Sequence, residues 1–166
     1  PPGIAFWPEY KGRDGCRTPM PWQSTQVNAG FTNGVASKPW LPVVAAHQAR
    51  ALDVAEADPD APLHFMRSFL AWRKQHPALV TGDVTYLDGG KETLVWVRSK
   101  NPTPKTPALL CAFNLSTETQ TLPWPTGLQV KQSLVVPGLP ATQQGRAAAQ
   151  ELTLPPYGVY FAALAA

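Results

Sequence analysis

The sequence predicts a mainly β fold, in which a long irregular loop and one amphipathic helix precede an antiparallel Greek-key β-sandwich. The chain contains 19 proline and 12 glycine residues, too many for a helical bundle. Only residues 58–76 repeat apolar side chains at helical spacing. From residue 79 onward, short apolar runs alternate with turn residues at intervals of about 8–12 residues, which is typical of sandwiches and barrels.

Residues 1–57 show no sustained period and are interrupted repeatedly by proline and glycine. They also contain Trp7, Trp22 and Trp40, and such aromatic content argues against disorder. We expect an ordered, irregular loop that lies against something else. One helix and seven short strands are not a natural partner for such a loop, so it resembles the end of a larger domain. The predicted division is 1–78 and 79–166.

The helix expected within residues 58–76 has recognisable ends. Asp58 can serve as the N-cap, with Pro59 at the first helical position. Pro77 is expected to end the helix, because the residue before a proline disfavours the helical region. Its larger apolar residues at helical spacing include Leu63, Met66, Phe69 and Leu70.

The sandwich is expected to contain several short strands. Their predicted ranges are 83–87, 93–98, 108–115, 119–122, 129–135, 151–154 and 158–164. Asp88-Gly89 between two apolar runs predicts a hairpin. The apolar runs 95–97 and 109–113 favour central strands. Residues 141–150 are small and polar, and we expect a surface loop there.

Composition excludes several classes of protein. The formal net charge is +3 and no run of basic residues occurs, so we expect no nucleic-acid partner. No stretch of 18 apolar residues is present, so we expect no membrane partner. Cys16 and Cys111 are too few for a disulfide scaffold. Both are expected to be buried thiols of a reduced, cytoplasmic chain.

The densest polar cluster lies within residues 11–22 and contains Arg13, Asp14 and Arg17. One interpretation is a turn held by an ion pair between Asp14 and either arginine. The other is a polar-ligand site with an arginine fork and Trp22 as a wall, the combination that sugar hydroxyls and ring faces need. We expect neither a metal nor a cofactor, because the histidines are widely separated and no glycine-rich phosphate loop follows a strand.

Several segments resemble one enzyme family. FWPEYKGRDGCRTPMPW, followed by NAGFT and PWLPV, resembles the α-glucosidase branch of glycoside hydrolase family 13, the α-amylase family. The FWPE and GRDGC forms are similar to α-glucosidases and α-glucosyl-transfer enzymes of Gram-negative bacteria. DPDAPLHFMRSFLAWRKQHPAL resembles their final barrel helix, and GDVTYLDG and LTLPPYGVYFAAL resemble strands of their C-terminal β domain. The resemblance covers essentially the whole chain in order.

The resemblance implies that the chain is the C-terminal portion of a retaining enzyme built on a (β/α)8 barrel. Residues 1–78 would then be the loop after barrel strand 8 and the last barrel helix, with the upstream polypeptide as partner. The family's catalytic acids would lie upstream, so we expect no catalytic residue here and no activity from this portion. The whole enzyme would act on nonreducing-end α-glucose of maltose, sucrose or short oligosaccharides. Linkage preference, hydrolysis versus transfer and oligomeric state stay open.

An alternative from another class is a noncatalytic β-sandwich module that binds carbohydrate or stabilises a partner domain. In the enzyme reading, Arg17 matches the family's arginine that contacts the terminal glucose and pairs with an Asp from an early barrel loop. Arg13 and Asp14 are second choices, which the ion-paired turn explains better.

Two aromatic groups are also expected to pack. In the long loop, the residues expected to pack rather than to stack on sugars are Trp22, Phe31 and Trp40. On the helix, the residues expected to lie between barrel and β domain, and to be exposed without the barrel, are Phe65, Phe69, Leu70 and Trp72.

Overall fold

The computed structural model describes residues 13–34, 37–148 and 150–165. The chain divides into two compact units, an N-terminal unit ending at His64 and a β unit from Phe65 to Ala166. The division after residue 78, which the family resemblance implies, stays a prediction. Residues 1–12, which include Trp7 and part of the polar cluster, lie outside the described residues.

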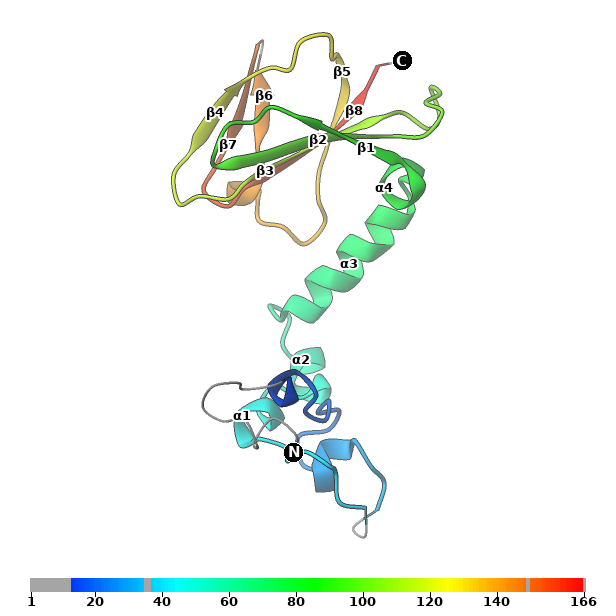
Figure 1. Ribbon diagram of the computed structural model, residues 1–166, viewed down its shortest axis with the longest axis vertical. Helices are drawn as coiled ribbons and strands as arrows, with labels where there is room; N and C mark the ends of the chain where they lie inside the picture. Colours follow the sequence, from blue (N-terminus) through cyan, green and yellow to red (C-terminus); the bar gives the residue numbers. More distant parts are fainter. Residues whose placement is uncertain (1–12, 35–36, 149, 166) are drawn as a thin grey trace. The chain divides into compact units, whose positions relative to one another are not determined.

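The N-terminal unit contains short helical elements rather than an unbroken irregular loop (Figure 1). Their bounds are η2 Asp14–Cys16, η3 Val27–Gly30, α1 Ala45–Gln48 and α2 Leu52–Ala57. The expectation of a structureless segment through residue 57 is therefore wrong for α1 and α2. Both occur in an alanine-rich stretch without proline or glycine, and alanine has the highest helix propensity. Each is too short to produce a visible apolar period.

The predicted amphipathic helix is present as α3 Pro62–Lys74, but it begins later than expected. Asp58 is not its N-cap, because its carboxylate accepts a hydrogen bond from the Asp60 amide at 3.0 Å and closes a turn. The helix ends before Pro77, as predicted. Pro77 then begins a second helix, α4 Pro77–Thr81, where its missing N–H costs nothing.

Strands of the β unit form two antiparallel sheets (Figure 1). Their bounds are β1 Asp83–Leu87, β2 Thr93–Ser99, β3 Leu109–Asn114, β4 Gln120–Pro123, β5 Val130–Leu134, β6 Arg146–Ala148, β7 Glu151–Leu154 and β8 Val159–Leu164. Among the described residues, one sheet has the order β1-β2-β3-β8-β5 and the other β4-β7-β6. The chain crosses between sheets after β3, β4, β5 and β7, which gives the predicted Greek-key sandwich. β2 and β3 are interior strands, as expected.

The predicted hairpin joins β1 to β2, where Leu87 pairs with Val95. Its turn needs a glycine at position 89, because a Cβ there would lie 2.7 Å from Thr93 Oγ1 and 2.8 Å from Val95 Cγ2. The predicted surface loop 141–150 is wrong in part. Within it, η4 Ala141–Gln143 and strand β6 form, and β6 pairs with β7. Small side chains gave β6 no apolar alternation from which to predict it.

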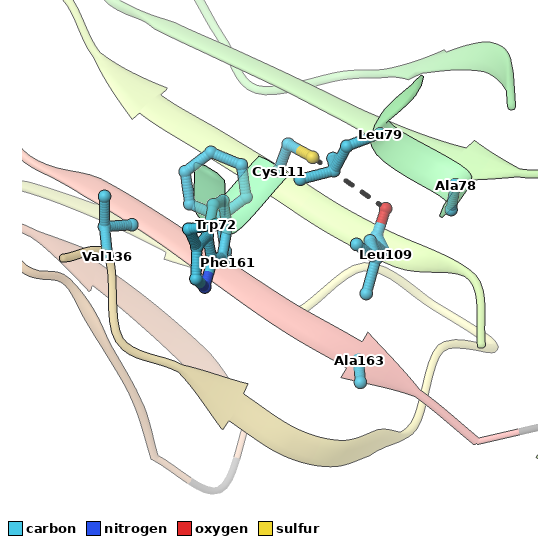
Figure 2. Close-up of a cluster of buried hydrophobic side chains, with 8 residues drawn as sticks. All are labelled: Trp72, Ala78, Leu79, Leu109, Cys111, Val136, Phe161 and Ala163. Atoms are coloured by element: carbon cyan, nitrogen blue, oxygen red, sulfur yellow. Dashed lines mark hydrogen bonds between the residues drawn. The ribbon is translucent and has the colours of Figure 1, made fainter. Parts of the chain in front are cut away.

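Two apolar clusters lie on opposite faces of the five-stranded sheet. Side chains of β3 alternate between them: Leu110 and Ala112 face the smaller sheet, whereas Leu109 and Cys111 face α3 and α4. Figure 2 shows the cluster that faces α3 and α4, where Trp72 lies beside Phe161. A strand buried on both faces accounts for the continuous apolar run in β3.

The helix face expected to be exposed is instead covered by the β unit. Trp72 is buried against Phe161, with ring centroids 5.3 Å apart. Phe65 and Phe69 are half-buried against the same cluster. Of the expected patch, only Leu70 is exposed (44%), and Met66 joins it on the outer face of α3 (48%). The prediction is wrong for Phe65, Phe69 and Trp72, because α3 has two apolar faces and the aromatic one packs on the sandwich. It is confirmed for Leu70.

Candidate functional site

Arg13 and Arg17 lie at the two ends of the single turn η2. The Cys16 amide donates to the Arg13 carbonyl at 3.1 Å, and the Arg17 amide donates to the Asp14 carbonyl at 3.0 Å. Both arginines are exposed and Asp14 is half-buried. Cys16 is exposed as well, which corrects the expectation of two buried thiols.

Backbone hydrogen bonds, rather than an ion pair, hold this turn. The Cys16 thiol also donates to the Arg13 carbonyl at 3.2 Å. Within the described residues, no ion pair or hydrogen bond engages the side chains of Arg13, Asp14 or Arg17. The ion-paired turn is therefore not formed in this part of the chain. Both guanidinium groups keep their donors available for a ligand or for residues beyond those described. An arginine fork with free donors can hold two adjacent hydroxyl oxygens.

The segment after Arg17 is held by a loop that contains two non-glycine residues in left-handed conformation. The Ala29 carbonyl accepts hydrogen bonds from the amides of Trp22 (2.8 Å) and Gln23 (3.0 Å). To reach that position, Asn28 and Ala29 both adopt left-handed backbone angles, with φ of 52° and 50°. Non-glycine residues rarely do so, and such conformations persist only where the surroundings enforce them. Ala29 is fully buried, and the Asn28 side chain donates to Thr32 Oγ1 at 2.8 Å.

Asp53, in the first turn of α2, fastens the same segment. Its carboxylate accepts bonds from the Ser24 amide (2.9 and 3.0 Å) and the Ser24 hydroxyl (2.9 Å). The backbone bond from Ser24, assisted by the hydroxyl and by the Val54 amide, lowers the pKa of Asp53 below its ordinary value. Sequence reasoning missed this contact, and the only available signal was an acidic residue followed by alanine-rich helix.

Three aromatic side chains in the described part of the N-terminal unit are exposed. Those previously expected to pack are Trp22, Phe31 and Trp40, and none is buried among the described residues. The structure does not decide between packing and use as sugar platforms, so the preference for packing stays a prediction.

The described residues form neither a metal site nor a reactive-thiol site. Within the described ranges, no group of three His, Cys, Asp or Glu side chains could hold a metal ion. Cys111 is buried on the sheet, and burial raises the pKa of its thiol to about 12. A neutral thiol at physiological pH is a poor nucleophile. No helix in the described part of the chain has the length and apolar character to cross a membrane.

Comparisons with known proteins identify the family. The family model described as Alpha amylase, catalytic domain, matches residues 4–82. A probable alpha-glucosidase of Rhizobium meliloti is 38% identical over 99% of this chain and 27% of its own length. An oligo-1,6-glucosidase of Parageobacillus thermoglucosidasius is 41% identical over 44% of this chain and 12% of its own length.

Solved structures agree. The alpha-glucosyl transfer enzyme XgtA superposes with a TM-score of 0.79 at 40% identity, over 98% of this chain and 28% of its own. Trehalulose synthase MutB of Pseudomonas mesoacidophila gives a TM-score of 0.66 at 28% identity, over 93% of this chain and 26% of its own.

The catalytic-domain match up to residue 82 and the sandwich that follows define part of a glycoside hydrolase. The chain belongs to the α-amylase family, glycoside hydrolase family 13, and it is similar to a probable alpha-glucosidase and to an alpha-glucosyl transfer enzyme. It spans about a quarter of the length of the relatives that match nearly all of it.

Proposed function

We propose that the parent protein is a retaining α-glucosidase-type enzyme that acts on nonreducing-end α-glucose of maltose, sucrose or short oligosaccharides. The similarity to a probable alpha-glucosidase along 99% of the chain carries this proposal. Retaining hydrolysis needs two carboxyl groups about 5–5.5 Å apart. None of the carboxylates of this chain matches the family's catalytic motifs, so the chain alone is inactive in this proposal.

Arg17 is the proposed contribution of this chain to substrate binding. In such barrels, the loops at the C-terminal face build the active site, and the N-terminal unit corresponds to one of them. The Arg17 guanidinium is exposed and unengaged by described residues, which leaves its fork free for the hydroxyls of a terminal glucose. The strained turn at Ala29 and the Asp53–Ser24 contact support a fixed loop, because strain of this kind often accompanies functional sites.

The upstream barrel is the partner that this proposal requires, and a cytoplasmic location accompanies it. Two free cysteines among the described residues support a reducing compartment, since oxidising compartments favour disulfides.

Hydrolysis of a chromogenic α-glucoside tests the proposal. The full-length parent should release the chromophore, and a β-glucoside should be inert. The 166-residue chain, purified free of any longer species, should show no turnover above background. Turnover by this chain alone would refute the fragment interpretation, and a full-length parent without α-glucoside activity would refute the assignment of reaction.

A noncatalytic carbohydrate-binding role is a second candidate, favoured by one surface of the β unit. Tyr86 on edge strand β1 is 70% exposed, and its ring lies 6.3 Å from that of Trp96, its cross-strand neighbour. Aromatic faces of this kind can stack on sugar rings. If this role holds, maltose should change the intrinsic tryptophan fluorescence of the chain, and Tyr86→Ala should abolish the change. An unchanged spectrum at saturating maltose would exclude it.

A further inference from the structure

A cavity of about 260 Å³ opens on the β unit beside α4 and strand β5. Apolar side chains that line it include Leu109, Leu134 and Ala163, of which Leu109 and Ala163 are buried. Its rim is polar and carries two lysines, Lys105 and Lys131. Among the described residues that line it, none is Asp or Glu. A concave site with an apolar floor and a few polar groups is the usual form of a small-ligand pocket.

The loop that carries Lys105 is closed by its own hydrogen bonds. It comprises residues 100–108 and joins β2 to β3, adjacent strands for which about 2–5 residues would suffice. Thr103 and Thr106 exchange both backbone hydrogen bonds at 3.1 Å, and their hydroxyls lie 2.8 Å apart. Pro104 and Pro107 further restrict the backbone. Lys105 therefore projects from a rigid loop tip, which reduces the entropy lost on binding.

Lys131 joins this loop to the sheet. Its ammonium group donates to the Pro104 carbonyl at 3.0 Å, which leaves two of its three N–H donors for a ligand. The Lys105 ammonium has no partner among the described residues. A third cation lies close by, because Arg98 Nε donates at 3.2 Å to the carbonyl of Ala78, a residue that lines the cavity. The charged side chains among the lining residues are therefore the two lysines.

His76 also lines the cavity, and a hydrogen bond fixes the orientation of its ring. Its Nδ1 lies 2.8 Å from the Trp72 carbonyl oxygen. A carbonyl only accepts, so Nδ1 carries the proton in this bond and Nε2 stays available for a further contact. Gln75 and Thr106 add neutral polar groups to the lining.

We propose that this cavity binds a small anion, a phosphate- or carboxylate-bearing molecule, through Lys105 and Lys131. Lysine is a common phosphate ligand, and a positive lining without carboxylates attracts an anion and offers nothing to a cation. The volume limits the ligand to a small one, below the usual range for drug-sized pockets. The site belongs wholly to the β unit and does not depend on the proposed α-glucosidase activity.

Titration calorimetry and NMR on the 166-residue chain test the proposal, with inorganic phosphate and succinate as probes. At least one probe should saturate and shift the amide signals of Lys105 and Lys131. The better probe distinguishes a phosphate ligand from a carboxylate ligand. Glucose, a neutral control, should cause no shift at these positions.

Two lysine variants separate ligand contact from loop support. Lys131→Gln removes a cation and also the bond to Pro104, whereas Lys105→Gln removes a cation with no described partner. Each should weaken binding of the better probe by about tenfold, the size of a charge-assisted contact. Lys91→Gln removes the same charge from the β1–β2 turn, outside the cavity, and should leave binding within about twofold. Absence of saturable binding by both probes, or equal loss in Lys91→Gln and Lys105→Gln, would overturn the proposal.

Discussion

The carboxylate of Asp53 and the backbone amide of Ser24 lie 2.9–3.0 Å apart, although 29 positions separate them in the sequence. This contact joins helix α2 to the segment that follows Arg17. The Asp53 and Leu52 amides reinforce it by donating to the carbonyls of Trp22 and Pro21. Side-chain and backbone hydrogen bonds at the N-terminus of α2 therefore hold the segment that follows Arg17.

Low pH should break the hydrogen bonds between Asp53 and Ser24. Because its hydrogen bonds favour the ionised carboxylate, Asp53 has a pKa below its ordinary value of 3.8 in the folded chain. Its stabilising effect is then fully present above the unfolded-state pKa, and it is lost as the pH falls from that value through the folded-state pKa. The Ser24 amide signal in NMR should titrate with a midpoint below 3.8. Asp53→Asn should remove that titration and Asp60→Asn should not. A midpoint at or above the ordinary value would contradict the assignment.

Asn114 should be the most sensitive polar residue of the sandwich. It is 3% exposed, and its amide donates to the carbonyls of Glu118 (2.7 Å) and Pro155 (2.8 Å), while its Oδ1 accepts from Ser116. Asn114→Asp would place a carboxylate against those carbonyls and should cost about 2–4 kcal/mol of unfolding free energy. Urea denaturation measures this loss.

A matched control for Asn114 is available. Asn33→Asp makes the same change at an exposed position and should stay within about 0.5 kcal/mol. Equal effects at the two sites would show that the Asn114 hydrogen bonds contribute nothing specific.

The two thiols should differ sharply in reactivity. Cys16 is exposed, whereas Cys111 is buried and its pKa is raised to about 12 by burial. A thiol reagent at pH 8 should modify Cys16 quickly and Cys111 only after denaturant is added, since thiolate is the reactive form. Cys16→Ser should therefore abolish the fast phase. A fast phase that survives this substitution would contradict the burial of Cys111.

The outer face of α3 should bind a hydrophobic dye in the isolated chain. Met66 and Leu70 are exposed there, and exposed apolar side chains of this kind offer a surface to such a dye. Replacing both by Lys should lower dye fluorescence and leave the melting temperature within about 2 °C. Phe69→Lys, on the covered face, should instead lower the melting temperature. A chain that binds no dye would refute the prediction.

The strands were predictable where side chains alternate or run apolar between turn residues. β3 is one example, with its continuous apolar run. The β1–β2 pair is another, because the Asp88-Gly89 turn joins its two strands. β6 was not predictable, because Arg146–Ala148 has no apolar pattern and forms only by pairing with β7. Which face of α3 is covered could not be predicted either. The sequence spacing places apolar residues on two faces, and packing against the sandwich decides between them.

The candidate site was predictable only in part. Arg17 was singled out by the family resemblance, because the residues alone left an ion-paired turn and a ligand site equally open. The supports of its loop could not be read from the sequence. The Asp53–Ser24 contact joins distant positions, and the left-handed conformation of Ala29 contradicts the preference of an ordinary alanine.

The paired arginine variants of the full-length parent test the central claim, that Arg17 binds the terminal sugar. Arg17→Ala should lower kcat/KM at least about tenfold and up to several hundredfold, with the melting temperature unchanged. Arg17→Lys should recover little, because an ammonium group cannot reproduce the two-pronged contact. Arg13→Ala should lower the melting temperature first, if it braces the loop in the longer chain. Near-normal efficiency in Arg17→Ala, with activity abolished in Arg13→Ala at unchanged stability, would contradict the assignment and exchange the two roles.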